Sequence, residues 1–414
     1  MGRAVPLDPA AIRSRFPALR RTQHGLPVAY LDGPGGSQMV DSCIEQMTAY
    51  LRAGAANLHG AFATSQETDA LLAEARAAAA ALLGAAPQEV AFGQNMTSLA
   101  FAVASALGPT WGKGDNIVVT ELDHRGNVDP WARAARLAGA EVRWLPVDTD
   151  RLVLDSGALE RVITERTRLV AIGRASNAVG TITDVAAIAR LASSAGAIVA
   201  VDAVHAAPHL PIDRDQLGAD ILFCSAYKFF GPHLGIVAIR DELFGRLDVA
   251  RVAPAPASPP DKLETGTQNH EALAGLLGAV SFIASLGAGT TLRERLVAGV
   301  AEIGEWEDGL AAGFRKDLAS IPGLRLYQAA EDVEKTPTIA LTLAGHSPRA
   351  VAAYLADHGV FVGDGNFYAS TLDERLGTLA TGGWVRVGLA PYTTAQELAT
   401  CRDCLHRLAA SANR

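Results

Sequence analysis

The sequence predicts an α/β protein built on a mostly parallel sheet. Five short apolar or β-branched runs alternate with helical segments in the middle of the chain, and they occupy residues 117–120, 142–145, 169–172, 198–201 and 221–224. Strands that are apolar throughout are typical of sheets covered on both faces, and their alternation with helices indicates parallel strands. A further run at 234–240 follows the fifth without an intervening helix. The sheet is therefore predicted to contain at least one strand of the opposite direction.

Helix signals flank these runs. Residues 64–84 are rich in Ala and Leu; Thr64 with Glu67 predicts a capping box, and Gly84 stands where a helix-ending glycine belongs. A second helix is expected to begin near Thr97. The segments 128–138 and 184–195 have the composition of helices that connect parallel strands.

The pattern changes after residue 270. Two long helical segments, 270–287 and 291–318, meet at Gly287–Gly289, and then strand candidates appear at 339–343 and 385–389 before a final helix at 394–410. A chain of 414 residues is too long for one ordinary core. We predict an N-terminal segment (1–25), a large domain (26–285) and a small C-terminal α+β domain (286–414), with the Pro-rich run 252–260 as a loop of the large domain.

Composition favours small-molecule chemistry. Apolar residues make up 49% and charged residues 19% of the chain, and the net charge is 36 − 44 = −8. An acidic chain without a Lys/Arg-rich run argues against nucleic acid or an anionic membrane as partner. Neither a secretory leader nor an 18-residue apolar span is visible, and four cysteines are too few for a disulfide framework. These features predict a cytoplasmic protein.

Two residues at the ends of neighbouring strands carry the main chemical signal. Asp202 ends the run AIVAVD, and Lys228 follows the run ILFCS between aromatic residues. A helix-capping Asp and a lysine at a strand end would each be ordinary alone. Ligands bind at the carboxyl ends of parallel strands, where burial lowers a lysine pKa. Together they match pyridoxal 5′-phosphate (PLP), which needs a Lys for its Schiff base and an Asp for its ring nitrogen.

The residues 225–232 carry a family resemblance. The stretch Ser225-Ala226-Tyr227-Lys228-Phe229-Phe230-Gly231-Pro232 resembles the motif S-x-[HY]-K-x-x-G-P of the class V aminotransferase family of fold-type I PLP enzymes. The similarity runs from YLDGPGG at 30–36 to WVRVGLAPYTT at 384–394 and is nearest to the cysteine-desulfurase-like branch. It implies a seven-stranded sheet, PLP as cofactor, an α-amino acid as substrate, and a homodimer.

The resemblance also implies roles for individual residues. His124 would stack on the pyridine ring and share in catalysis with Lys228 and Asp202, while His205 and Asn177 would lie near the phenolic oxygen of the cofactor. The phosphate would lie at the start of the helix near Thr97. Its ligands are expected to be Met96, Thr97, Ser225 and, from the neighbouring subunit, Thr267.

Other residues are expected to contact the substrate. Arg386 matches the family arginine that binds the substrate carboxylate, which a guanidinium pairs with through two parallel hydrogen bonds. The alternative is that Arg386 is a surface arginine on an edge strand, without a role in binding. Asn177 is expected at the same carboxylate, and His59, with Asn57 and the GPGG turn at 33–36, is expected to line the pocket.

One position departs from the desulfurase pattern. Tyr368, in VGDGNFYA, stands where the relatives have a sulfur-accepting cysteine, so we expect Tyr368 to contact substrate but to carry no persulfide. Cys401 and Cys404 form a CxxC with no partner pair and are expected to be packing residues, with no metal site. We rank β-elimination of the C–S lyase type first, before transamination and epimerisation. A PLP-fold regulatory or assembly protein is the alternative outside catalysis.

Overall fold

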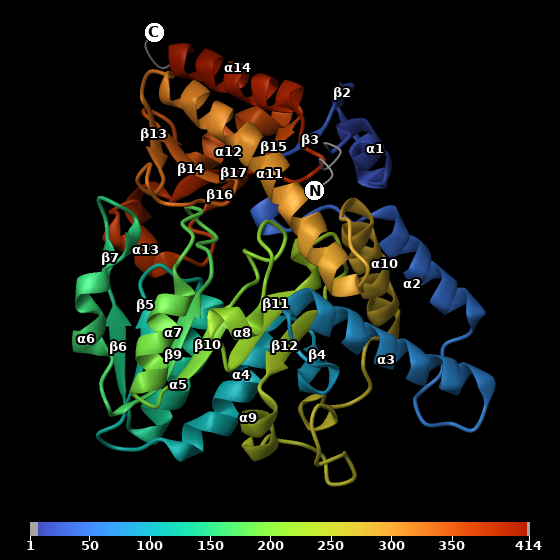
Figure 1. Ribbon diagram of the computed structural model, residues 1–414. Coiled ribbons are helices and arrows are strands. Elements are labelled where there is room, and N and C mark those ends of the chain that lie inside the picture. The colour runs from blue at the N-terminus through green and yellow to red at the C-terminus, as the bar shows by residue number, and fades with distance from the viewer. Residues whose placement is uncertain (1–6, 412–414) are drawn as a thin grey trace.

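The computed structural model describes residues 7–411, and its centre is a seven-stranded sheet (Figure 1). The strand order is β4-β12-β11-β10-β9-β5-β6. The strands are β4 (Val90–Gly93), β5 (Asn116–Thr120), β6 (Glu141–Leu145), β9 (Thr167–Gly173), β10 (Ile198–Asp202), β11 (Ile221–Ser225) and β12 (Gly235–Ile239). From β6 to β11 every pair is parallel, whereas β12 runs antiparallel to both β11 and β4.

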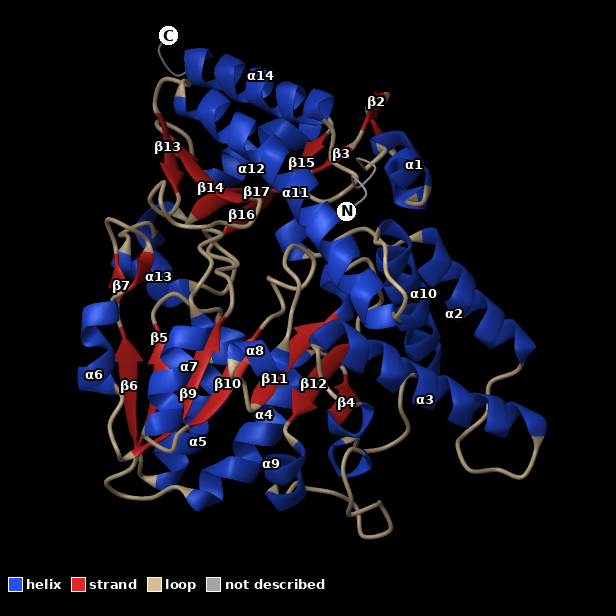
Figure 2. Cartoon of the chain, viewed as in Figure 1, coloured by secondary structure: helices blue, strands red, loops and turns tan. Residues whose placement is uncertain are grey.

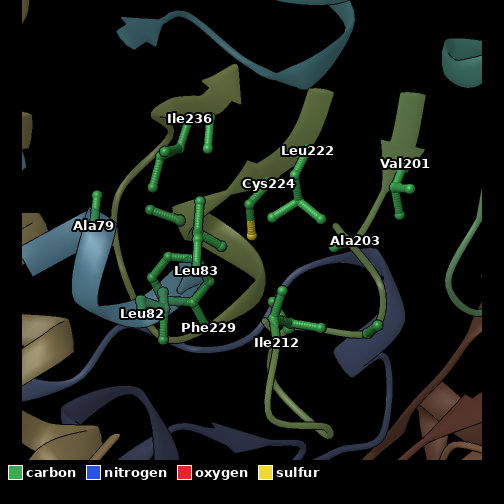
Figure 3. Packing of buried hydrophobic residues seen from close by; sticks show 14 of the residues in the cluster. Ala79, Leu82, Leu83, Val201, Ala203, Ile212, Leu222, Cys224, Phe229 and Ile236 are labelled. Carbon is green, nitrogen blue, oxygen red and sulfur yellow. The ribbon is translucent and has the colours of Figure 1, made fainter. Parts of the chain in front are cut away.

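Helices cover both faces of this sheet, as Figure 2 shows. Along β11, Ile221 and Phe223 belong to the apolar cluster under α4 (Met96–Leu107) and α5 (Asp129–Ala138), because successive side chains of a strand point to opposite faces. Leu222 and Cys224 pack in the other cluster, with α3 (Ala63–Leu83), α7 (Val185–Ser194) and α10 (His270–Leu286). Figure 3 shows part of that second cluster, in which Cys224 lies among Leu222, Phe229 and Ile236. The sheet is therefore buried on both sides.

The C-terminal part of the chain forms a second, four-stranded antiparallel sheet of order β13-β14-β17-β16. Its strands are β13 (Leu324–Tyr327), β14 (Thr338–Leu343), β16 (Gly363–Gly365) and β17 (Trp384–Gly388), and its helices are α12 (Pro348–Asp357) and α14 (Ala395–Ser411). The long helix α11 (Leu292–Ala319) runs from α10 to this second sheet (Figure 1). Strand β3 (Ala29–Tyr30) joins the same region by pairing in parallel with β15 (Val360–Phe361).

Helix α2 (Asp41–Ala53) packs tightly against α10. A Cβ placed on Gly278 of α10 would lie 2.3 Å from the carbonyl oxygen of Ser42, so only glycine permits this approach. The remaining helices and strands are short: α1 (Pro9–Ser14), β1 (Thr22–Gln23), β2 (Leu26–Pro27), β7 (Val147–Asp148), β8 (Val153–Leu154), α6 (Leu159–Val162), α8 (Arg214–Leu217), α9 (Asp241–Arg246) and α13 (Ser370–Arg375). Two 3₁₀ turns matter for the site, η2 (Gly33–Gly35) and η7 (Ala226–Lys228).

The structure confirms the predicted fold class, including the mixed sheet, and corrects one helix start. α3 begins at Ala63, with Phe62 in extended backbone at its N-cap, and no side chain caps it. The capping box predicted for Thr64 and Glu67 is wrong, because Thr64 already lies inside the helix and its carbonyl accepts a hydrogen bond from the Thr68 hydroxyl (3.0 Å). Gly84 ends α3 in the left-handed conformation, as predicted (φ 66°).

The domain boundaries at residues 25/26 and 285/286 stay predictions. The expected absence of a leader concerns a stretch that includes residues 1–6, which lie outside the described residues. Within residues 7–411, none of the helices is both long and apolar enough to cross a membrane.

Candidate active site

The candidate site lies where the carboxyl ends of β10 and β11 face the second sheet. Asp202 is the last residue of β10 and Ser225 the last of β11, and the turn η7 carries Lys228 directly after β11. β12 then leads back antiparallel to β11. The lysine-bearing turn is thus held between two hydrogen-bonded strands.

Lys228 lies in a buried environment. Its Nζ donates a hydrogen bond to the carbonyl oxygen of Pro34 in η2 and stands 4.8 Å from the centroid of the Tyr227 ring. Burial, followed by the positive charge of Arg386, lowers the pKa of Lys228 to about 7, against the opposing effect of Asp202 and Asp32. A substantial fraction of this amine is therefore neutral and nucleophilic near neutral pH.

Asp202 supplies the strand-end carboxylate that the sequence predicted, and its side chain is half-buried. Its Oδ1 accepts a hydrogen bond from the Val204 amide (2.8 Å), and burial raises the pKa of Asp202 to about 6. Behind it lies Asp123, which accepts hydrogen bonds from the Asn127 side chain (2.9 Å) and the Gly173 amide (3.0 Å). Burial raises the pKa of Asp123 to about 7. A cation beside Asp202 would favour its ionised form.

Two histidines are held neutral at the site. The Nδ1 of His124 accepts a hydrogen bond from the Gly126 amide (2.8 Å), and burial, with the charges of Lys228 and Arg386, lowers its pKa to about 4. A neutral imidazole can stack on an aromatic ring without bringing a charge to it. His205 is buried, with its Nε2 at 3.0 Å from the hydroxyl of Thr338 and 3.1 Å from that of Thr336, and burial lowers its pKa far below 6.5.

The N-terminus of α4 faces the ends of β11 and β12. The Met96 amide donates to the Ser225 hydroxyl (3.1 Å), and the Asn95 side chain caps the helix by accepting from the Ser98 amide (2.9 Å). A Cβ on Gly235 would stand 2.4 Å from the Asn95 backbone, so glycine there lets β12 reach this corner. The N-terminal end of a helix favours an anion such as a phosphate.

Arg386 and Asn177 lie together, and the charge of Arg386 acts on Lys228. Arg386 is only 4% exposed, its Nη1 donates to the carbonyl oxygen of Asn177 (2.8 Å), and its Nε has no partner in the described part of the chain. Burial lowers the pKa of Arg386 to about 9. The Asn177 side-chain oxygen is also buried without a partner among residues 7–411. This pair leaves a buried donor and a buried acceptor for a ligand.

Three predicted residues lie outside this group. His59, on the loop between α2 and α3 at the right of Figure 1, is solvent-exposed and contacts Asp69 (3.2 Å), and within one chain it is not brought to Lys228. Thr267 lines a cavity of about 530 Å³ next to Gln94 and Ser98, on the outer side of the start of α4. Tyr368 lies at the rim, with its ring 5.3 Å from that of His124.

Sequence reasoning missed Asp32 and Phe367. Asp32 is a half-buried carboxylate. Burial raises its pKa, and the positive charges of Arg386 and Lys228 partly oppose that rise. Its position directly before the GPGG turn was an available signal. Phe367 places its ring centroid 3.8 Å from the Arg386 guanidinium carbon, and nothing in the sequence indicates this contact.

These features fit PLP. The site combines a lysine of lowered pKa, a half-buried carboxylate without an ion pair among residues 7–411, a neutral histidine and a helix N-terminus. Near them, buried polar atoms of Asn177 and Arg386 have no partner among the described residues. This set provides an amine, a ring-nitrogen partner and an anion site. Together with the fold, it defines a PLP-dependent enzyme of fold type I.

Comparison with known proteins agrees. The aminotransferase class-V family model matches residues 29–400, so the chain belongs to that family. A cysteine desulfurase of Pectobacterium atrosepticum is 30% identical over 409 residues, which cover 94% of each chain, and one of Klebsiella pneumoniae is 31% identical over 403 residues, covering 94% of this chain and 95% of the relative.

Solved structures show the same architecture. The cysteine desulfurase CsdA from Escherichia coli has a TM-score of 0.84 at 28% identity, with 97% of this chain and 98% of that chain covered. The apo cysteine desulfurase from Thermococcus onnurineus NA1 has a TM-score of 0.87 at 26% identity, with 99% and 100% covered. The predicted family is therefore confirmed.

Proposed function

We propose that the protein deprotonates a small α-amino acid at Cα and releases a sulfur-containing group from Cβ, a β-elimination of the C–S lyase type. The observation that carries this proposal is that one site contains both Lys228, whose pKa is lowered to about 7, and the buried Arg386, whose Nε has no partner among the described residues. One group can take a proton while the other holds the substrate carboxylate.

Bound PLP supplies an electron sink for the pair of electrons left when the Cα proton is removed. The residues of the chain move the proton, bind the cofactor and orient the substrate. Lys228 accepts the proton, which an amine of pKa near 7 does well at neutral pH. Asp202 holds a proton on the ring nitrogen, His124 covers the ring, and Arg386 with Asn177 orients the carboxylate. Met96, Thr97 and Ser225 hold the phosphate.

Elimination is ranked above sulfur transfer because the cysteines offer no reactive thiol. All four cysteines, Cys43, Cys224, Cys401 and Cys404, are buried, and burial raises the pKa of each thiol, that of Cys43 to about 12. A thiolate is the nucleophile that would accept sulfur. Tyr368, which the resemblance puts at the position of the sulfur-accepting cysteine, lies exposed beside His124.

Covalent trapping tests the central assignment. Borohydride reduction of the holoenzyme followed by peptide mapping should find the cofactor on Lys228, and Lys228→Ala should abolish turnover in a folded protein. Lys262, whose Nζ is bound by the carbonyls of Gly245 and Leu247, is the control lysine. An adduct on Lys262, or none at all, would refute the assignment.

Product analysis separates the reactions. Across a panel of amino acids, pyruvate or another keto acid formed with ammonia indicates elimination, with the thiol or sulfide measured separately. A second amino acid formed from an added keto acid indicates transamination, and loss of optical rotation alone indicates epimerisation. Absence of bound cofactor and of turnover would instead favour a regulatory or assembly role.

The same proposal includes a homodimer. Thr267 borders the cavity beside the start of α4, and a threonine from a partner subunit would add a hydroxyl to the phosphate site. A location in the cytoplasm stays a prediction from the sequence.

A further inference from the structure

Two consecutive aromatic residues place one ring beside Arg386 and the other beside His124. The Phe367 ring centroid lies 3.8 Å from the guanidinium carbon of Arg386, and the Tyr368 ring centroid lies 5.3 Å from that of His124. Phe367 is partly buried and Tyr368 is 71% exposed. We call Phe367 and Tyr368 the aromatic wall.

The aromatic wall is held in place from several sides. The Asn177 side-chain amide donates to the Phe367 carbonyl (2.8 Å), the Arg125 backbone amide donates to the Tyr368 carbonyl (2.8 Å), and the Asn366 side chain accepts from the Tyr368 amide (3.1 Å). Phe367 and Tyr368 both have left-handed backbone, with φ of 54° and 60°. Non-glycine residues keep that conformation only where their surroundings enforce it. The backbone that carries the two rings is therefore fixed.

The position of Arg386 brings a substrate against this wall. One face of the guanidinium is covered by Phe367 and its Nη1 is bound to Asn177, which leaves the edge that carries Nε, without a partner among the described residues, for a carboxylate. The β-carbon of an amino acid is only two bonds from the carboxylate carbon. A substituent at that carbon can therefore reach the Phe367 ring, and a long one can extend to Tyr368.

We propose that the aromatic wall selects, among small α-amino acids, those that carry an apolar substituent at Cβ, such as an alkyl or aryl thioether, over free cysteine. This inference rests on the proposed function, whose substrate class it names. An apolar substituent gains by leaving water for the two rings, whereas a thiol or hydrogen has too little surface to fill the space beside them.

Binding of unreactive analogues tests the wall without turnover. The holoenzyme would be titrated calorimetrically with α-methylphenylalanine and with 2-aminoisobutyrate, both of which lack a Cα proton. We expect α-methylphenylalanine to bind at least about tenfold more tightly. Phe367→Ala should bring the ratio of the two dissociation constants close to one, and the ratio is the readout because it cancels a change in carboxylate binding common to both analogues.

Two further variants keep the test decisive. Phe101→Ala makes the same truncation on the exposed side of α4 and should leave the ratio unchanged. If Phe367→Ala does not fold, Phe367→Leu carries the test and should lower the ratio at least about threefold. Equal binding of both analogues by the unaltered enzyme, or an unaltered ratio in a folded Phe367 variant, overturns the inference.

The outcomes also separate this inference from the proposed function. Discrimination between the analogues without thiol release from any amino acid supports the wall and refutes elimination. Thiol release together with equal binding of the analogues supports elimination and refutes the wall.

Discussion

Burial brings the pKa values of Lys228 and Asp202 close together. The pKa of the lysine falls to about 7 and that of the carboxyl rises to about 6, because each group loses water on entering the site. The two side chains sit at the ends of adjacent strands, so the sheet fixes their separation. A cofactor that brings a positive ring nitrogen would restore the ionised form of Asp202.

Asp32 is predicted to hold the pKa of Lys228 higher than burial alone would. Its negative charge stabilises the protonated amine and so raises the pKa of Lys228, which means that Asp32→Asn should lower it. In cofactor-free protein, the rate at which an acylating reagent modifies Lys228 should be half-maximal near pH 7. In Asp32→Asn the midpoint should lie roughly one pH unit lower. Mass spectrometry of the Lys228 peptide measures both.

Asp150→Asn is the matched control, because Asp150 is an exposed carboxylate on the turn between β7 and β8. It should leave the midpoint unchanged. A midpoint that moves upward in Asp32→Asn would contradict the assigned sign.

Asp202 is predicted to be required for turnover but not for cofactor retention. Asp202→Ala removes the partner of the ring nitrogen and should lower kcat roughly 100-fold or more. The contacts at the start of α4 are unchanged, so the visible absorbance of bound cofactor should persist. Near-normal kcat with the cofactor bound would show that another group controls the ring nitrogen.

At the scale of elements, the approach of β17 to η2 is unusually close. A Cβ on Gly388 would stand 1.9 Å from the Cδ of Pro34, whose carbonyl accepts the Lys228 hydrogen bond. Gly388→Ala should therefore part the two segments and lower the free energy of unfolding by about 1–3 kcal/mol. Urea unfolding measures the change.

At Gly313, a glycine-to-alanine substitution is expected to stabilise the protein. This glycine lies in α11 with no atom within 4 Å of an added Cβ, so Gly313→Ala should raise the free energy of unfolding by up to about 1 kcal/mol, as alanine does in a helix interior. Equal destabilisation by both substitutions would show that the contact with Pro34 is not the cause.

The elements that the sequence predicts well are those whose side chains are buried on both faces. Each of the five strand runs at 117–224 lies within an observed strand, because an apolar run needs no partner to be recognised. β16, with the sequence Gly-Asp-Gly, carries no strand signal and exists only through its pairing with β17. That register places Gly363 opposite Arg386 and so sets where Phe367 falls. A contact of this kind depends on tertiary pairing and cannot be read from local sequence.

The candidate site likewise contains residues that the local sequence predicts and residues that only the tertiary structure brings together. Lys228 and Asp202 follow strand ends and could be inferred from the pattern, while Arg386 needed the family resemblance. Asn177 and Phe367 meet through a hydrogen bond that spans 190 positions in the chain. No local property of either residue predicts that contact.

At the scale of the whole molecule, no cysteine is expected to carry sulfur. Changing all four cysteines to serine should leave the native activity largely intact, and cysteine treatment should add no sulfur mass to any of them. Cys224→Ser should cost roughly 1–3 kcal/mol, because it places a hydroxyl in the apolar cluster of Figure 3. Activity is therefore compared on folded, cofactor-loaded protein. A persulfide that turns over with substrate would contradict the elimination.

A second whole-molecule prediction concerns the dimer. If Thr267 completes the site of the neighbouring subunit, Thr267→Ala should weaken cofactor binding, and a mixed dimer of Thr267→Ala with Lys228→Ala contains one intact site. Mixing the two variants under conditions of subunit exchange should give more activity than the mean of the two alone. Activity no higher than that mean would contradict sharing of the site.

The pairing of β3 with β15 also bears on synthesis at the ribosome. Residues 29–30 emerge early, yet their partner at 360–361 follows some 330 residues later, since 360 − 30 = 330. At a translation rate of about 5–20 residues per second, this strand waits roughly 15–65 s for its neighbour. During that interval the nascent chain exposes an unpaired edge, so its yield in cells should depend on chaperones that shield such edges until translation ends.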